Sequence, residues 1–362
     1  MKITVKTITL QEMLSKATKA VTNNKLLPIT GLIGIKCENN KLTLVTSDAT
    51  NYMYVSSESV VGDNIDVTVS ADMFAKLISK ITCDTVTLSV TDDYLEIKGN
   101  GTYKLEFPFD ENGSIVKFPD KFKKLDSKVI DEGTISSSTI NSILTSVKPA
   151  LAVTPEAPCY MGYYVGDTVV GTDTYKIARL DTKLFNVPTL ISAELMNLVG
   201  IISDAEIEYT MYKDGSITFV SDTIKIYGKK MNGIEDYSID AINNLISVTT
   251  DSSCSVSKTD ILQLLDRLAL FVNPYDKNGI RLTFTEDKLI VDSRSNSGVE
   301  AIEYLSKSNV KELSCLIDIE MLQSQIKSVP SDTITMYFGL DTALTISHDK
   351  LTNMVAFLDD FE

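Results

Sequence analysis

Few side chains in this sequence are of the types that catalyse reactions, and their spacing does not suit catalysis. The one histidine, His348, stands in Ile346–Lys350, a predicted hairpin turn at the surface, so histidine metal pairs are excluded. No P-loop or Gly-x-Gly-x-x-Gly segment opens a helix after a strand. Adjacent acids such as Asp92-Asp93 and Asp359-Asp360 diverge in a strand and indicate solvated turns. The sequence therefore predicts no enzyme, no catalytic residue, no cofactor and no metal site.

The cysteines indicate the compartment. There are five of them, an odd number without a Cys-x-x-Cys pair: Cys37, Cys83, Cys159, Cys254 and Cys315. This pattern favours free thiols in a reducing cytoplasm over disulfides or zinc. No apolar run approaches the ~18 residues of a membrane span, and the N-terminus has the alternation of a strand, not a signal peptide. We expect a cytoplasmic protein with no membrane partner.

The net charge alone argues against a nucleic-acid partner. Lys and Arg number 34 and Asp and Glu 49, which gives −15 at neutral pH. Phosphates should repel such a protein as a whole. Only the placement of the charges can reverse this expectation.

An internal repeat determines the predicted fold. Apolar residues at i, i+3, i+4, i+7 and i+11, one face of a helix, recur three times. The three series are Leu10, Met13, Leu14, Ala17, Val21; Ile140, Ile143, Leu144, Val147, Leu151; and Ile261, Leu264, Leu265, Leu268, Val272. The residue before each series is expected to be the N-cap, namely Thr9, Thr139 and Asp260.

A second helix recurs with the same order of landmarks. It begins at Ser70-Ala-Asp-Met-Phe74, Ser192-Ala-Glu-Leu-Met196 and Asp318-Ile-Glu-Met-Leu322, again with Ser or Asp at the cap, and a strand signal follows each copy. Most of the remainder alternates polar and apolar residues between Asn-Gly and Asp-Gly turns. We predict an α+β fold of three tandem domains, each with two helices packed on antiparallel sheet. The segment Lys117–Leu125 is a linker, a second boundary lies near Ile239–Val248, and the domains are residues 1–126, 127–245 and 246–362.

Positive charge concentrates on the predicted helices. Beyond the first turns, the six helices carry seven basic residues and one acid, whereas first-turn acids suit the helix dipole. The seven are Lys16, Lys19, Lys76, Lys80, Lys148, Arg267 and Lys327. Lysines also populate solvated helix faces in general, which is the simpler explanation for any one of them.

The repeat, the acidic body and the basic helix faces together resemble the bacterial sliding clamp, the β subunit of DNA polymerase III, over residues 1–362. Leu26–Gly31 is similar to the family's Leu-Pro-Ile-x-Gly loop, Val69–Phe74 to the start of its second helix, and Gly171–Ala178 to its Thr-Asp-Gly-His-Arg-Leu-Ala signature. Here Thr174, Tyr175 and Lys176 replace Gly-His-Arg, and the C-terminus also differs, so the chain is identified as a divergent member.

The resemblance implies a processivity factor that encircles duplex DNA without reading sequence. Three domains per chain imply a head-to-tail homodimeric ring of six. The implied DNA contacts are the seven basic residues together with Asn24 and Lys25. The implied dimer interface joins an edge strand, Tyr103–Phe107 with Lys104, Leu105 and Phe107, to Leu270 and Phe271 of a second copy.

The resemblance further implies an apolar groove for short peptides of polymerases and the clamp loader. Its residues would be Met161, Thr172, Tyr175, Lys176, Ile177, Ala343, Val355, Phe357 and Leu358, with Asp318 and Met321 at the rim. The simpler alternative is that Val355 and Phe357 complete the last strand and face the core. A non-DNA scaffold or adhesion-type β-repeat protein is an alternative function, and a hydrolase is a third.

Overall fold

A computed structural model describes residues 1–123, 125, 127–154, 156–248, 252–272, 278–285, 288–294, 300–306, 313–338 and 342–358. The chain forms two compact units. Unit 1 is Met1–Ile140 with Glu194–Lys230, and unit 2 is Asn141–Ala193 with Met231–Glu362. The predicted domains, with boundaries at residues 126 and 245, follow the sequence repeats, whereas the two units follow the packing of the chain. The predicted boundaries therefore stay a prediction.

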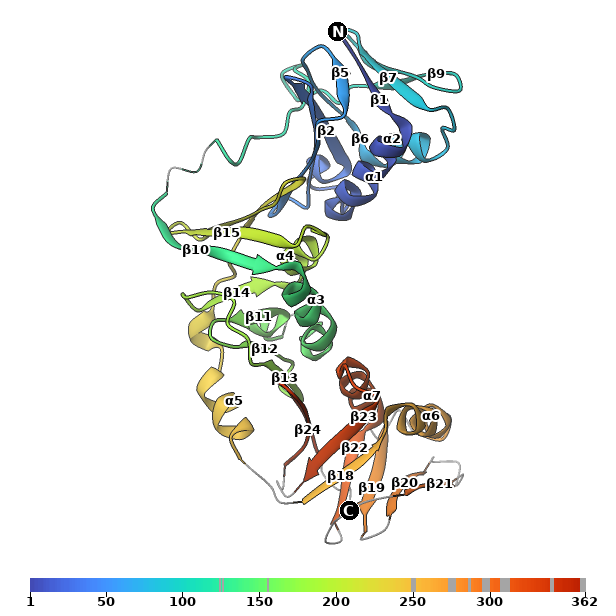
Figure 1. Ribbon diagram of the computed structural model, residues 1–362, viewed down its shortest axis with the longest axis vertical. Helices are drawn as coiled ribbons and strands as arrows, with labels where there is room; N and C mark the ends of the chain where they lie inside the picture. The colour runs from blue at the N-terminus through green and yellow to red at the C-terminus, as the bar shows by residue number, and fades with distance from the viewer. Residues whose placement is uncertain are drawn as a thin grey trace. The chain divides into compact units, whose positions relative to one another are not determined.

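The strands of unit 1 form two kinds of antiparallel sheet (Figure 1). A five-stranded sheet has the order β5-β1-β7-β8-β9, with β1 Lys2–Lys6, β5 Val60–Gly62, β7 Thr85–Val90, β8 Tyr94–Lys98 and β9 Thr102–Glu106. An eight-stranded sheet has the order β10-β15-β16-β17-β4-β3-β2-β6, with β2 Leu32–Glu38, β3 Lys41–Ser47, β4 Tyr52–Ser57, β6 Ile65–Ser70, β10 Val129–Ser136, β15 Glu206–Tyr212, β16 Ser216–Val220 and β17 Ile224–Lys229.

The strands of unit 2 also form an eight-stranded antiparallel sheet and a smaller one. The larger has the order β14-β11-β12-β13-β25-β24-β23-β18, with β11 Gly162–Val165, β12 Val169–Thr172, β13 Lys176–Leu180, β14 Thr189–Ser192, β18 Ser252–Ser257, β23 Thr333–Phe338, β24 Ala343–His348 and β25 Leu351–Ala356. The smaller has the order β21-β20-β19-β22, with β19 Gly279–Phe284, β20 Lys288–Arg294, β21 Glu300–Ser306 and β22 Leu313–Asp318. The hairpin predicted around His348 is confirmed by β24 and β25.

The helices follow the expected order of the repeats. The first helices are α1 Thr7–Ala17, α3 Ser137–Ser146 and α6 Lys258–Leu268, and the second are α2 Ala71–Ser79, α4 Ala193–Val199 and α7 Ile319–Ser328. The short 3-10 helices are η1 Thr18–Ala20, η2 Pro28–Gly31, η3 Lys148–Ala150, η4 Pro158–Met161 and η5 Ile234–Asp236. No helix in the described ranges is long and apolar enough to cross a membrane.

The predicted caps of the first helices were wrong by three residues each. Helix α1 follows β1 directly, so Thr9 lies inside it. The Oγ of Ser136 accepts from the backbone N–H of Thr139 at 3.1 Å, and the Oγ of Ser257 accepts from that of Asp260 at 3.3 Å. A serine at the end of each preceding strand therefore satisfies a first-turn donor of α3 and of α6.

The caps of two second helices are confirmed. The Oγ of Ser70 accepts from the N–H of Met73 at 3.5 Å, and Asp318 Oδ1 accepts from the N–H of Met321 at 2.9 Å. In each case the side chain satisfies an orphan first-turn donor.

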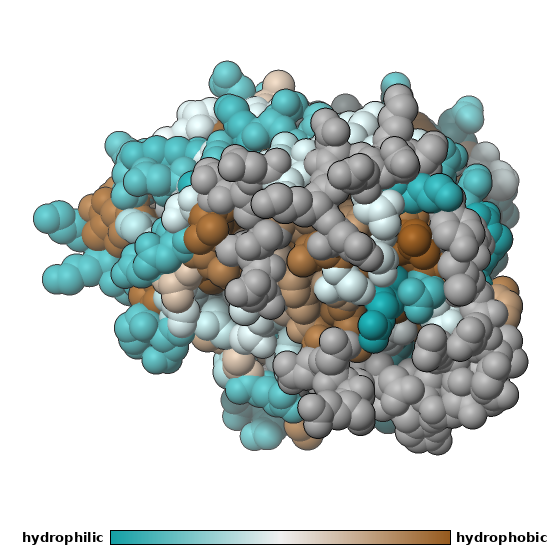
Figure 2. Space-filling view, turned by 90° about the horizontal axis from the view of Figure 1, so that it is seen from below, coloured by the Kyte–Doolittle hydropathy of each residue, from teal (hydrophilic) through white to brown (hydrophobic). Residues whose placement is uncertain are grey.

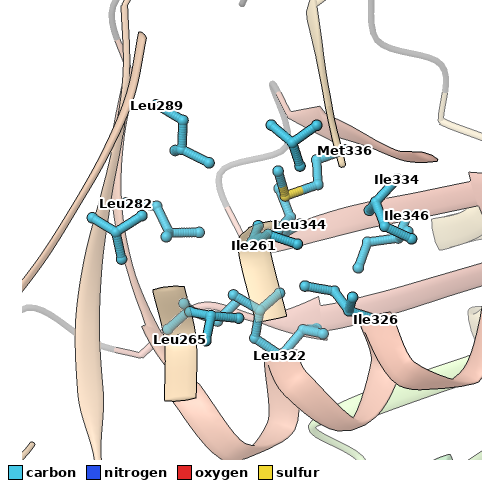
Figure 3. Packing of buried hydrophobic residues seen from close by; sticks show 14 of the residues in the cluster. Ile261, Leu265, Leu282, Leu289, Leu322, Ile326, Ile334, Met336, Leu344 and Ile346 are labelled. Atoms are coloured by element: carbon cyan, nitrogen blue, oxygen red, sulfur yellow. The ribbon is translucent and has the colours of Figure 1, made fainter. Parts of the chain in front are cut away.

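The core of unit 2 shows why the helical period was a reliable signal. Ile261 and Leu265 of α6 and Leu322 and Ile326 of α7 are completely buried and point toward one another (Figure 3). They pack against strand residues of both sheets, including Leu282, Leu289, Ile334, Met336, Leu344 and Ile346. Burying side chains of this size, at about 1.5–3 kcal/mol each, is a main source of the fold's stability.

One helix was not expected. The boundary region predicted near Ile239–Val248 contains α5, Ile239–Ile246. Figure 1 shows α5 on the side of the β11–β13 strands opposite to α7. Unit 2 therefore has cover on both faces of its large sheet.

Candidate functional site

The turn between β12 and β13 is built by two side chains that cap its backbone. Asp173 Oδ1 accepts from the N–H groups of Tyr175 at 3.0 Å and of Lys176 at 2.7 Å. The Oγ1 of Thr172 accepts from the N–H of Thr174 at 3.0 Å and donates to the carbonyl of Lys176 at 2.6 Å. Thr174 has φ 78°, in the left-handed region that favours glycine. This network holds a threonine in a conformation that it rarely adopts.

Lys176 is held within the protein by this turn. Its Nζ lies 3.3 Å from Asp173 Oδ2 and donates to the carbonyl of Pro149 at 2.8 Å. Burial raises the pKa of Asp318, an effect that the N–H donors of α7 and the positive charge of Lys176 oppose. Lys176 and Asp318, which were both predicted at the groove, are thus half-buried and interact electrostatically.

The pairing of β13 with β25 divides the predicted groove residues between two faces. Ile177 is opposite Met354, and Lys176 is opposite Val355. Directly opposed residues share a face, and successive residues alternate faces. Ile177 and Met354 belong to one cluster with Ala343, whereas Val355 belongs to the cluster that α6 and α7 cover.

Val355 does not reach the surface, because it is completely buried in the helix-covered core. Phe357 packs against the same core and is half-buried. The alternative that Val355 and Phe357 complete the last strand and face inward therefore agrees with these positions. The resemblance implied that Val355 lies in the groove with Ile177, but in the structure Met354 is the residue opposite Ile177.

The remaining predicted groove residues surround Ile177 in part. Thr172 is buried and its hydroxyl is used in the turn, Met161 ends η4 and is half-buried, and Tyr175 is 58 % exposed. The C-terminal segment runs beside the turn, because the N–H of Ala356 donates to the carbonyl of Tyr175 at 2.8 Å and that of Leu358 to Leu316 at 2.8 Å. The acidic tail, residues 359–362, lies outside the described residues.

Helix α5 contributes residues that the sequence analysis missed. Ile242 is buried against Ile177 and Met354, while Ile239, Leu245 and Ile246 are only partly buried on the same cluster. Ile239, Ile242 and Ile246 are spaced at i, i+3 and i+7, which is a helical pattern in the sequence. Apolar side chains that remain partly exposed beside Ile177 extend the predicted groove along α5.

Two tyrosines, Tyr237 and Tyr160, border the same cluster. The Tyr237 hydroxyl donates to the carbonyl of Val170 at 3.2 Å, and burial raises the pKa of Tyr237 far above its usual range. Its ring centroid lies 5.0 Å from that of Tyr160 in an edge-on contact. Tyr160 and its neighbour Cys159 are themselves partly buried. Tyr160 and Tyr237 therefore give this cluster an aromatic border.

The basic residues share one local position. Each lies in the last turn of an α-helix or in the residues that directly follow it, and each is exposed or half-buried: Lys16, Lys19, Lys76, Lys80, Lys148, Arg267 and Lys327. Positive charge is stabilised there by the helix dipole. Lys76 also pairs with Asp72 at 2.8 Å. Helix electrostatics therefore favours these positions independently of any ligand.

The predicted DNA-contacting loop is an ordered turn. The N–H of Asn24 donates to Thr30 Oγ1 at 2.8 Å, and Asn24 Oδ1 accepts from the N–H of Leu26 at 2.9 Å. Asn24 and Lys25 are exposed, and Leu26 is 88 % exposed. The loop presents both polar and apolar side chains to solvent. Elsewhere on the molecule, in the view from below in Figure 2, apolar residues also lie at the surface among hydrophilic ones.

The predicted edge strand ends its sheet. Strand β9 pairs only with β8 in the described part of unit 1, and Tyr103, Lys104 and Glu106 are exposed. Leu105 is half-buried, but Phe107 is buried in unit 1 itself. In unit 2, Leu270 follows α6 and is 82 % exposed, so it does not pack in the core. Phe271 is half-buried.

Among the described residues, no three His, Cys, Asp or Glu side chains lie together in a way that could hold a metal ion.

Comparison with known proteins gives one family and one fold. Residues 1–112 match the family described as DNA polymerase III beta subunit, N-terminal domain. No curated protein matches by sequence. The fold is similar to the DNA polymerase sliding clamp of Bacillus subtilis (16 % identity, 100 % of each chain, TM-score 0.84) and to the beta subunit of Streptococcus pyogenes (13 %, 99 % of this chain and 100 % of that one, 0.87). It is also similar to a Pseudomonas aeruginosa sliding clamp bound to griselimycin (15 %, 99 % of each, 0.85).

Proposed function

Because residues 1–112 match the model of the DNA polymerase III beta-subunit N-terminal domain and the whole chain is similar in fold to sliding clamps, we propose that this protein is a DNA sliding clamp. It encircles duplex DNA and tethers a replicative polymerase without chemistry of its own. The observation that carries this proposal is the fold match over 99 % or more of both chains. A fold alone does not determine a function, so surface features must support the proposal independently.

The first supporting feature is the basic set at the helix ends. Lysine and arginine side chains there can contact phosphates without reading bases, which gives weak and sequence-independent binding. An acidic remainder would then repel DNA from the other surfaces. Asn24 and Lys25 lie on an exposed loop in unit 1 and can add contacts to the backbone.

The second supporting feature is the pair of surfaces suited to self-association. The unpaired edge of β9 offers backbone hydrogen bonds to another strand. The exposed Leu270 offers apolar area at a different place on the chain. Two different surfaces that meet between copies form a heterologous contact, which closes into a ring when the rotation allows. We propose a head-to-tail homodimer.

The third supporting feature is an apolar cluster of unit 2 that is only partly covered. Ile177, Ala343 and Met354 are buried in it, whereas Ile239, Leu245 and Ile246 of α5 are partly exposed and Tyr175 is exposed. We propose that these residues line an apolar groove. A partner Leu or Phe side chain fully buried there contributes ~1.5–3 kcal/mol. Polymerase and clamp-loader peptides are the proposed occupants, with backbone hydrogen bonds setting their register.

The decisive experiment measures retention on DNA with and without ends. The protein is loaded onto nicked circular DNA with a clamp loader of the same cell and freed of unbound protein by gel filtration. A restriction enzyme then linearises half of the sample. We expect retention on the circle and rapid loss from the linear molecule. Equal retention on both would mean simple adhesion and would refute the clamp.

Assembly is tested separately by light scattering at micromolar concentration. We expect a dimer mass, and Leu270→Glu should shift the equilibrium toward the monomer because a charge then occupies the interface. A matched control is Val153→Glu, which introduces the same charge at a valine that is 88 % exposed and outside the proposed interface. A strictly monomeric wild-type protein would contradict the ring.

A further inference from the structure

A seam in the large sheet of unit 1 joins strands of the first and second repeats. Strands β4 and β17 meet in the middle of this sheet, with Ile224 opposite Val55 and Tyr227 opposite Tyr52. The register covers four residue pairs, fewer than the six that join β3 to β4. A short pairing of this kind opens more readily than its neighbours unless something else holds it.

The segment 117–123 crosses the outer face of this sheet toward the seam. It contacts strands in the order in which the sheet arranges them. Lys117 Nζ lies 3.2 Å from Asp66 of β6, and Phe118 covers Gly34 of β2, where an added Cβ would lie 3.0 Å from its ring. The segment then reaches β4 and β17, so it bridges both sides of the seam.

Tyr54 of β4 fixes the segment by its hydroxyl and its ring. The hydroxyl donates to the carbonyl of Pro119 at 3.2 Å and accepts from the N–H of Lys121 at 3.2 Å. Burial raises the pKa of Tyr54 to about 12, so the hydroxyl stays protonated and remains a donor at neutral pH. Its ring makes an edge-on contact with Phe122, with the centroids 5.3 Å apart.

Two lysines connect the segment to both seam strands. Lys121 Nζ lies 4.6 Å from the ring centroid of Tyr52 on β4 and 5.6 Å from that of Tyr227 on β17. In the opposite sense, Lys225 of β17 places its Nζ 5.6 Å from the ring centroid of Phe122. Cations at these distances are attracted to the ring faces.

Release of the segment would uncover side chains of the outer face, among them the buried Tyr52 and Tyr227, but not the core residues on the opposite face of the sheet. A cavity of about 860 Å³ lies between it and the outer face of the sheet, and charged and hydroxyl side chains line much of its wall. The core residues of β4, Met53 and Val55, point to the opposite side and are completely or almost completely buried. The segment is therefore attached by a few discrete contacts on a solvated face.

We propose that residues 117–123 are a clasp that holds the β4–β17 seam closed, and that release of the clasp lets the seam open locally. While the clasp is attached, strands from two repeats behave as one sheet. This inference does not depend on DNA or on the proposed ring.

The test compares two lysines of the same segment by hydrogen–deuterium exchange of the full chain. Lys121→Met removes the charge that faces Tyr52 and Tyr227 while keeping the length of the side chain. Lys123→Met is the matched control, because Lys123 is exposed and its ion-pair partner is Asp120 of the same segment, at 3.8 Å. Tyr54→Phe is a second, conservative variant that removes both hydroxyl contacts.

We expect Lys121→Met and Tyr54→Phe each to accelerate exchange of the seam peptides, residues 52–57 and 224–229, by roughly 2- to 5-fold. In both variants, exchange in β7 and β8 of unit 1 should match the wild type. In the control Lys123→Met, exchange of the seam peptides should also match the wild type. Unchanged seam exchange in Lys121→Met and Tyr54→Phe would overturn the clasp. An equal acceleration in all strands of unit 1 would also overturn it, because the segment would then support global stability and not the seam.

Discussion

Tyr175 offers the sharpest test of the proposed groove, because it is exposed in a turn that hydrogen bonds of Thr172 and Asp173 hold in place. Its 58 % exposure leaves roughly 120 Å² of a side chain that can bury about 200 Å² in total. At about 25 cal/mol per Å², covering that area with a peptide contributes at most ~3 kcal/mol. Ordering of the side chain offsets about 0.5–1.5 kcal/mol of this. The expected loss for Tyr175→Ala is therefore roughly 10- to 100-fold in Kd.

The measurement is fluorescence polarisation with a labelled C-terminal peptide of the cognate polymerase. Phe109→Ala is the matched control, since this ring is 52 % exposed and lies in unit 1, whereas the groove lies in unit 2. Stability should change by less than about 0.5 kcal/mol in both variants, because neither ring is part of the core. Wild-type affinity in Tyr175→Ala, or an equal loss in Phe109→Ala, would place the peptide site elsewhere.

Three further outcomes follow from local contacts. Asp318→Ala should lower the unfolding free energy in urea by about 0.5–2 kcal/mol through the lost cap, and Asp318→Asn should not. Because burial raises the pKa of Asp318, the folded state binds more protons than the unfolded state, so the wild type should lose stability relative to Asp318→Asn as pH rises from 4 to 7. Gly162→Ala should lower the free energy of unfolding by about 1–3 kcal/mol, because the added Cβ would lie 2.6 Å from the Ile191 carbonyl oxygen. Gly166→Ala is the control, because its added Cβ would lie 3.6 Å from the nearest atom, so its thermal melt should match the wild type. Burial raises the pKa of Cys315 to about 12, so iodoacetamide at pH 8 should modify it only in denaturant, as mass spectrometry would detect.

The helix faces could be predicted from the sequence, but the starts of the first helices could not. Burial selects positions such as Leu10 and Ile261 at the helical period, and both are completely buried. The start of a helix depends on any nearby oxygen that can accept a first-turn N–H. Ser136 and Ser257 at the ends of strands supply that oxygen before the threonine or aspartate that the sequence favoured.

The face of a strand was harder to predict where apolar residues are consecutive. The run Met354-Val355-Ala356-Phe357-Leu358 does not alternate, so period two has no polar residue to mark its outer face. The pairing of Ile177 with Met354 determines which residues of β25 face each side of the sheet. This pairing joins segments far apart in the sequence. Val355 was assigned to the groove by the resemblance, and the apolar run itself offered no polar residue that argued against this assignment. Helix α5 did carry a readable signal in Ile239, Ile242 and Ile246, but it fell where a boundary was expected.

The large sheet of unit 2 is covered unequally on its two faces, and this favours the proposed groove on one of them. The helix face is covered by α6 and α7, with eleven and ten residues, and they bury a continuous core. The other face has α5, whose eight residues reach only about 12 Å. An eight-stranded sheet extends about 34 Å across its strands at ~4.8 Å spacing. One short helix cannot cover that width, so Leu245 and Ile246 remain partly exposed beside the buried Ile177. An apolar face left partly open in this way is stabilised by a partner's side chains, which is the requirement that a tethering protein must meet.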